Sequence, residues 1–155
     1  MEPRILTVTD VCKVSRYTRN QLRGVLDELP CYAEQPTSER VAREFFRSDL
    51  SVLSVVYVLD RQFSIRRTAI TRIIDQLLET LKGPKTANRE AWLLVTFDPP
   101  SVRYLTEQEP IQNGILVALS PIFERVDIYA AGNPLHENYA EPELDFGPTL
   151  IFAKR

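Results

Sequence analysis

The side chains in this sequence that are best suited to chemistry are cations gathered where no carboxylate balances them. Positions 11 to 26 hold four Lys and Arg residues and no Asp or Glu. Arg19 and Arg23 are spaced i and i+4, so a helix presents both on one face, with Asn20 beside them and Arg16 and Tyr17 just before. Arg can bind a guanine edge or a phosphate, and Asn can bind an adenine edge. The pattern indicates a surface that suits the major groove of a duplex or, as the simpler alternative, a solvated basic face.

Two arginines further along the chain, Arg40 and Arg43, belong to the short run "RVAREF". We expect this run to form a strand of a hairpin from which both arginines reach the neighbouring DNA backbone or minor groove. The alternative is an exposed strand that charge keeps soluble. With the turn residues included, the predicted DNA-binding residues are Arg16, Tyr17, Thr18, Arg19, Asn20, Arg23, Arg40 and Arg43.

Residues that support catalysis or bind metals are few. The single histidine, His136, lies in "AGNPLHENY", with no nucleophile at a recognisable spacing. Cys12, Cys31 and His136 are too scattered for a closed zinc site, and no Gly-rich phosphate loop occurs. We therefore expect no enzyme activity, no metal and no cofactor, and we expect both cysteines to be reduced thiols.

The elements that must position the basic residues follow from caps and hydrophobic spacing. Thr7 or Thr9 is expected to cap a short helix over positions 8 to 12, and Thr18 a second helix over 19 to 29. Two short helices joined by a tight turn are typical of a helix-turn-helix. The runs "CYA" and "RVAREF", with "EQPTSE" between them, predict a two-stranded wing.

Two longer helices are expected to complete the first part of the chain. Ser48 precedes "DLSVLSVVYVLDRQF", which has almost no polar face and is therefore expected to be the buried centre. Ser64 precedes an amphipathic pattern over 65 to 82. Gly83–Pro84 should end this last helix, because Gly caps helices and Pro cannot continue them.

Beyond that point the sequence favours strands. The runs "AWLLVTF", "VRYL", "GILVAL", "VDIYA" and "TLIFA" are rich in branched and aromatic residues, although "GILVALSPIFERV" could hold a helix around Pro121. We predict an α+β fold. Residues 1–83 form a winged helix-turn-helix domain with four helices and a two-stranded wing, 84–90 form a linker, and 91–155 form a small, mainly β domain.

Charge and aromatic content suggest different tasks for the two parts. Residues 1–85 carry 14 Lys and Arg against 11 Asp and Glu, whereas residues 86–155 carry 5 against 10. The first part therefore suits a polyanion, and the second suits self-association or an effector. Its aromatic residues could line an effector pocket, or more simply form core. They are Trp92, Phe97, Tyr104, Phe123, Tyr129 and Phe152. No apolar run approaches the ~18 residues of a membrane span, and no signal peptide is visible, so we expect a cytoplasmic protein.

The order and wording of the first 80 residues resemble the MerR-type winged-helix DNA-binding domain. "LTVTDVCKVSRYTRNQLR" is similar to the opening of that family, with Gln21, Leu22 and Arg23 where the family has Thr-Ile-Arg. "REFFRSDL" resembles its Arg-x-Tyr-x-x-x-Asp-Leu run, with Phe45 in place of Tyr, and "FSI" stands where the family has Phe-Ser-Leu.

Three features depart from that family. Arg16 replaces the turn Gly, Gly24–Val25 replaces an aromatic pair, and Gly83–Pro84 ends the fourth helix where family regulators continue into a dimerising coiled coil. The chain thus resembles small phage-encoded regulators and excisionases more than full regulators.

The resemblance implies a sequence-specific transcriptional regulator of phage or mobile-element type. It would bind double-stranded DNA as a homodimer held by the C-terminal part. The alternatives are an architectural or recombination directionality factor, and a protein-interaction module that has lost DNA binding.

Overall fold

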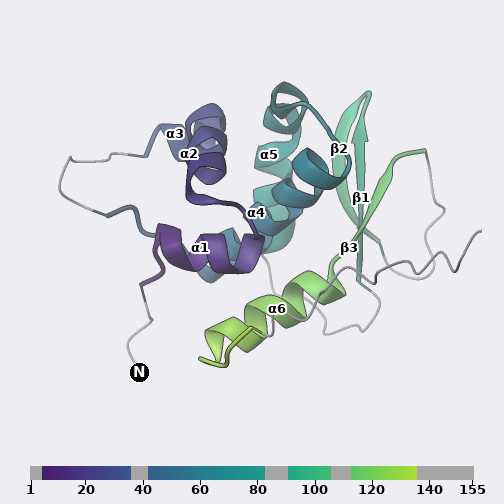
Figure 1. Ribbon diagram of the computed structural model, residues 1–155. Coiled ribbons are helices and arrows are strands. Elements are labelled where there is room, and N and C mark those ends of the chain that lie inside the picture. Colours follow the sequence, from purple (N-terminus) through teal and green to yellow (C-terminus); the bar gives the residue numbers. More distant parts are fainter. Residues whose placement is uncertain (1–4, 36–41, 83–90, 106–112, 136–155) are drawn as a thin grey trace, which may run out of the picture.

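The fold combines helices with one antiparallel sheet. The computed structural model describes residues 5–35, 42–82, 91–105 and 113–135. These residues form six α-helices, one π-helical turn and one three-stranded antiparallel sheet, so the predicted α+β class is confirmed. Figure 1 shows the helices of the first half stacked beside the sheet, with the last helix crossing beneath them.

The first two helices begin at the capping threonines that the sequence indicates. Helix α1 spans Val8–Ser15, and the Asp10 carboxylate accepts hydrogen bonds from the Thr7 backbone N–H (2.7 Å) and hydroxyl (2.9 Å). Helix α2 spans Arg19–Glu28 and begins with a reciprocal capping box formed by Thr18 and Gln21. The two helices are joined by the three residues 16–18, so both predicted helices and the tight turn are confirmed.

The expected first strand of the wing is wrong. The segment Pro30–Ala33 forms the short helix α3 instead. Pro30 has the fixed φ that suits a first helical position, and Tyr32 is buried with its hydroxyl donating to Asp49 Oδ1 at 2.8 Å. Residues 36–41 lie outside the described part, and residues 42–44 are not in a strand. In the described part of the expected wing, Phe45 pairs with Leu6 in an isolated antiparallel bridge.

The central and amphipathic helices form where expected, but with other starts. Helix α4 spans Arg47–Tyr57, is buried along most of its length, and continues into the π-helical turn η1, Val58–Gln62. Asp49, not Ser48, provides the start, because its Oδ2 accepts the Phe46 N–H at 2.8 Å. Helix α5 spans Arg67–Lys82, and Ser64 lies before it in a left-handed conformation with φ 54°.

The sheet is built from three of the predicted strands. Strand β1 (Trp92–Phe97) lies between β2 (Pro100–Leu105) and β3 (Ile115–Ala118), and all neighbours are antiparallel. Helix α6 spans Ser120–Ala130 with Pro at its start, as the alternative around Pro121 anticipated. The strand expected at "VDIYA" is therefore wrong, because these residues complete α6. The run "TLIFA" and Phe152 lie outside the described residues.

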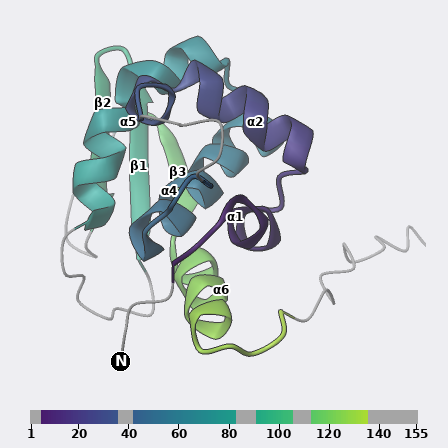
Figure 2. The same ribbon diagram turned by 90° about the vertical axis from the view of Figure 1, so that its left-hand side faces the viewer.

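The helical part and the sheet share one hydrophobic core. Helix α5 packs on β1 and β2, and α6 packs on α4 and α1, which leaves α4 at the centre (Figure 2). Polar side chains also cross between the parts: Arg47 pairs with Asp127, and the Tyr129 hydroxyl donates to Asp10. The predicted linker 84–90 lies outside the described residues, and the two segments that flank it pack as one unit.

None of the described helices combines the length and the apolar character that a membrane crossing demands.

Candidate nucleic-acid interface

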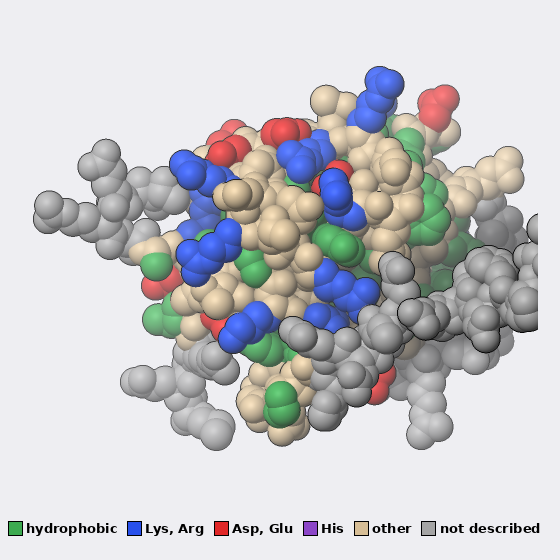
Figure 3. Space-filling model, in the orientation of Figure 1, with side chains coloured by type: hydrophobic (Ala, Val, Ile, Leu, Met, Phe, Trp, Pro, Cys, Tyr) green, Lys and Arg blue, Asp and Glu red, His purple; other side chains and the backbone are tan. Residues whose placement is uncertain are grey.

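The exposed surface of α2 begins with the residues that the sequence indicates for base contacts. Arg19, Asn20 and Arg23 are all exposed, while Leu22, Val25 and Leu26 on the opposite side enter the core. Asp27 follows Arg23 one turn later, so the basic surface is confined to the N-terminal half of the helix. We call Arg16, Arg19, Asn20 and Arg23 the basic surface. Figure 3 shows Lys and Arg side chains spread over the face on which α1 and α2 lie.

This placement of charge opposes helix stability. The N-terminal end of a helix carries partial positive charge, so cations in the first turn are unfavourable there. Helix α2 has no acidic residue in its first turn and begins at Arg19. An anion that approached this end would contact both the exposed arginines and the positive end of the helix.

The turn between the helices has a left-handed residue that is not glycine. Arg16 adopts φ 72° and ψ 3°, and its backbone N–H donates to the Cys12 carbonyl at 3.1 Å, closing α1. A side chain in this conformation costs backbone free energy that Gly would not.

Arg19 also connects the two helices. Its Nη2 donates to the Thr9 hydroxyl at 2.7 Å, so the guanidinium spans from the start of α2 to α1. Its charge lies near Cys12, where it partly offsets the burial that raises the thiol pKa. The guanidinium has five donors, which leaves others to face outward.

Tyr17 is a core residue and does not belong to the candidate interface. Its side chain is 2 % exposed, and its hydroxyl donates to Asp60 Oδ2 at 2.9 Å. The ring packs edge-on against Tyr57, with centroids 5.0 Å apart. Burial and the Asp60 carboxylate raise its pKa above the ordinary value. The prediction that Tyr17 contacts DNA is corrected, because its polar atom is used inside the chain.

Arg67, which the sequence did not single out, holds α2 against the rest of the helical part. Its Nη1 donates to Glu28 Oε1 at 3.0 Å, and its Nε lies 3.6 Å from Asp60 Oδ2. A Cβ added at Gly24 would lie 3.2 Å from the same Nη1. Gly24, a weak helix former, thus leaves room for this guanidinium. The i, i+4 spacing that predicts the faces of a single helix does not predict a contact between two helices.

The remaining predicted contacts have mixed outcomes. The Thr18 hydroxyl accepts the Gln21 backbone N–H at 3.3 Å, so its role in the structure is to cap α2. Arg43 is partly exposed in a segment without a strand, and Arg40 lies outside the described residues, as does His136.

Both thiols are free. Burial raises the pKa of Cys12, and burial together with Asp75 raises that of Cys31 to about 11. Among the residues placed by the structure, no three His, Cys, Asp or Glu side chains cluster as metal ligands would.

The comparisons with known proteins leave the interpretation to this geometry. No family model, no curated protein sequence and no solved structure matches the chain.

Proposed function

We propose that this chain binds double-stranded DNA sequence-specifically and regulates transcription, with α1 and α2 as the helix-turn-helix of a MerR-like winged-helix domain. One observation supports it most: Arg19, Asn20 and Arg23 are exposed together on the first half of a capped helix that follows a three-residue turn. The N-terminal residues of the second helix are those that reach base edges in this motif.

The residues divide between reading bases and holding phosphates. Arg19 and Asn20 lie in the first turn of α2 and have the donors and acceptors that distinguish guanine and adenine in the major groove. Arg23, one turn later, and Arg16, in the turn, would bind phosphates and fix the orientation of the helix. Arg43 remains a proposed phosphate contact.

The wing is the least supported part of the resemblance. With α3 in place of its first strand, the winged-helix assignment depends on the order of α1, α2, α4 and α5. A phage or mobile-element origin, and DNA bending as in excisionases, remain proposals that rest on the same resemblance alone. A protein-interaction module is the second candidate, favoured by the large apolar side chain of Phe46, which is 77 % exposed.

We also propose a homodimer, because a two-fold protein would bind a palindromic site. The C-terminal part offers β3, which lies at an edge of the sheet as described.

Selection of bound sites from random duplex DNA tests the proposal. We expect an enriched motif, and a palindrome if the chain binds as a dimer. Arg19→Ala and Asn20→Ala should each relax preference at one or two base pairs and cost about 1–3 kcal/mol at the selected site.

The matched comparison is Arg23→Ala, which should weaken all sequences alike. No enrichment over input would contradict specific binding. Unchanged base preference in Arg19→Ala and Asn20→Ala, with altered preference in Arg23→Ala, would reverse the assigned roles.

A further inference from the structure

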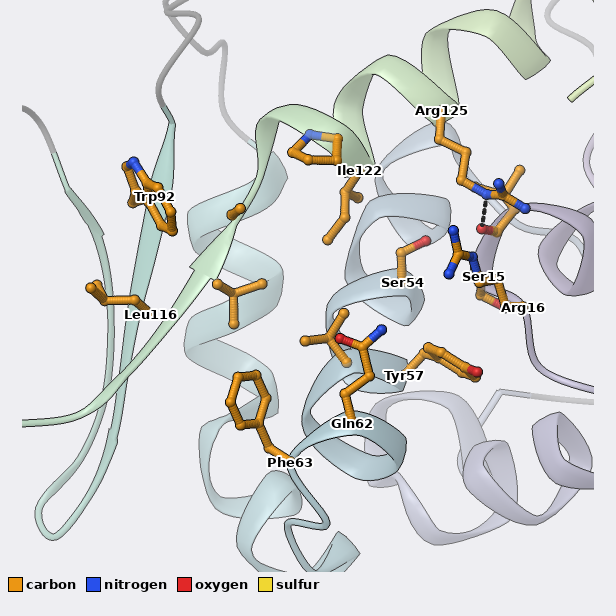
Figure 4. Close-up of a pocket in the computed structure, with 15 residues that line it drawn as sticks. Ser15, Arg16, Ser54, Tyr57, Gln62, Phe63, Trp92, Leu116, Ile122 and Arg125 are labelled. Carbon is orange, nitrogen blue, oxygen red and sulfur yellow. Dashed lines mark hydrogen bonds between the residues drawn. The ribbon is translucent and has the colours of Figure 1, made fainter. Parts of the chain in front are cut away.

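One side chain of the basic surface is held in place by a residue that does not belong to that surface. Arg19 Nη2 donates to the Thr9 hydroxyl at 2.7 Å, and both side chains are exposed. The bond is charge-assisted because the guanidinium is ionised. Arg16, by contrast, lines a cavity between the helical part and the sheet, together with Arg125 (Figure 4). Thr9 on α1 therefore bears on how Arg19 on α2 meets a ligand.

The Thr9 hydroxyl supports Arg19 without cancelling its charge. Thr9 is the second residue of α1, and the start of that helix is capped by another side chain, because the Asp10 carboxylate accepts the Thr7 backbone N–H at 2.7 Å. A hydroxyl is a neutral acceptor, whereas an Asp or Glu in its place would form an ion pair with the guanidinium. Arg19 thus keeps its full positive charge for an anionic partner.

The hydrogen bond to Thr9 also determines which donors of Arg19 remain for DNA. A guanidinium has two edges with a pair of parallel N–H groups, one formed by Nε and Nη2 and the other by Nη1 and Nη2. Each edge uses one of the two Nη2 hydrogens. When Nη2 donates one hydrogen to Thr9, one edge is occupied and the other keeps both donors. A guanine presents two acceptors in the major groove, N7 and O6, and one complete edge matches them.

The contact further reduces the freedom that Arg19 would lose on binding. Arg has one of the largest side-chain entropies, and ordering such a side chain at an interface lowers the affinity. Arg19 is tied at both ends, by its own backbone in α2 and by Thr9 in α1. The two helices are fixed relative to each other because Val11 and Leu22 enter the same hydrophobic core. The guanidinium is therefore ordered before DNA arrives.

We propose that Thr9 is a positioning residue that determines specificity: it orders the Arg19 guanidinium so that one complete edge reads a single guanine. This inference rests on the proposed function, because it assigns a base to a surface that is proposed to read DNA. It also separates Arg19 from Arg23, whose proposed partner is a phosphate.

The experiment uses the full chain and three variants. Thr9→Val removes the hydroxyl and keeps the branched shape, whereas Thr9→Ser keeps the hydroxyl. Thr80→Val is the matched control, because Thr80 lies on α5 and its hydroxyl donates to the Gln76 carbonyl at 2.7 Å, away from α2. Affinity is measured for the site selected from random duplex DNA and for duplexes in which each of its guanines in turn is replaced by adenine.

Thr9→Val should weaken binding to the selected site by about three- to tenfold, and it should reduce the preference for guanine at one position. Its salt dependence should match that of the unaltered chain, because no charge is removed. Thr9→Ser should retain the affinity and the preference, and Thr80→Val should change neither. In the Arg19→Ala background Thr9→Val should have no further effect, because the two residues act through one contact. In the free chain, nitrogen NMR should detect slow rotation of the Arg19 guanidinium, and Thr9→Val should abolish it.

The possible results distinguish the role of Thr9 from the proposed function. No DNA binding by the unaltered chain would overturn both. Specific binding that depends on Arg19 and is unaffected by Thr9→Val would overturn the role of Thr9 alone. That role would also be overturned if Thr9→Val weakened all duplexes equally, if it caused the same loss in the Arg19→Ala background, or if Thr9→Ser lost as much affinity as Thr9→Val.

Discussion

Replacement of Arg16 by Gly separates what the turn requires from what the basic surface requires. Arg16 adopts φ 72°, a left-handed conformation that costs a non-glycine residue roughly 1–2 kcal/mol. Glycine loses more backbone entropy on folding, which returns roughly 0.5–1 kcal/mol of that gain. We therefore expect Arg16→Gly to stabilise the fold by about 1 kcal/mol, which for a chain of this length raises Tm by about 2–4 °C.

The same change should weaken DNA binding, because it removes a cation from the turn before α2. Thermal and urea unfolding measure the first effect, and titration of a duplex measures the second. A variant that is more stable but binds DNA more weakly is the result expected for a residue that is retained for function.

Ser64→Gly is the matched control. Ser64 is also left-handed, with φ 54°, and exposed, but it carries no charge. It should gain stability as Arg16→Gly does and leave the affinity for DNA unchanged. If Arg16→Gly lowered the free energy of unfolding by 1 kcal/mol or more, side-chain contacts of Arg16 would outweigh its backbone strain and the reasoning would be wrong.

Three further substitutions test the packing around the interface. Tyr17→Phe removes the hydrogen bond to Asp60, whose side chain is 12 % exposed, and should cost about 1.5–2 kcal/mol in urea unfolding with no change in DNA affinity; a large affinity loss would restore Tyr17 to the interface. Gly24→Ala should leave the free energy of unfolding nearly unchanged in the native chain but raise it by about 1 kcal/mol in the Arg67→Ala variant. The reason is that the Arg67 guanidinium, which crowds the new methyl group in the native chain, is then absent. Equal effects in both backgrounds would exclude this crowding. The raised pKa of Cys31 means that the unfolded thiol ionises first, so stability should fall as pH rises from about 9 to about 11, and less so in Cys31→Ala; identical pH profiles would contradict the assignment.

Local chemistry was enough to predict the helical part of the fold. Thr18 with Gln21 marks the start of α2, and the nearly continuous apolar run of α4 indicates a buried helix. In both cases the signal lies within a few residues of the feature that it determines. The alternative around Pro121 succeeded for the same reason, because Pro at a first turn is a local signal.

The wing failed because its first strand was decided by packing between elements. Cys31, Tyr32 and Ala33 suit a strand as well as a helix by propensity. Tyr32 is buried beside Phe45 and donates to Asp49, and these partners are 13 and 17 positions away in the chain. Contacts at that separation are not visible in a short window of sequence, so tertiary structure overrode the local preference.

The same limit applies to the site. The exposed side of α2 followed from the positions of Arg19 and Arg23, whereas the burial of Tyr17 depends on Asp60 of η1. The cavity could not be foreseen either. The pocket between the helices and the sheet is lined by both Arg16 and Trp92. These residues lie on opposite sides of the predicted linker, so the sequence analysis assigned them to separate domains.

The affinity of the full chain for a duplex over a series of salt concentrations tests the central proposal most directly. Phosphate contacts make the logarithm of affinity fall steeply with the logarithm of salt concentration. Arg23→Ala should reduce the magnitude of that slope by about 1. Lys82→Ala, which removes an equal charge at the far end of α5, should leave it unchanged. No duplex binding below about micromolar at low salt, where even non-specific binding reaches this range, or the same slope in Arg23→Ala as in the unaltered chain, would contradict a DNA interface on α2.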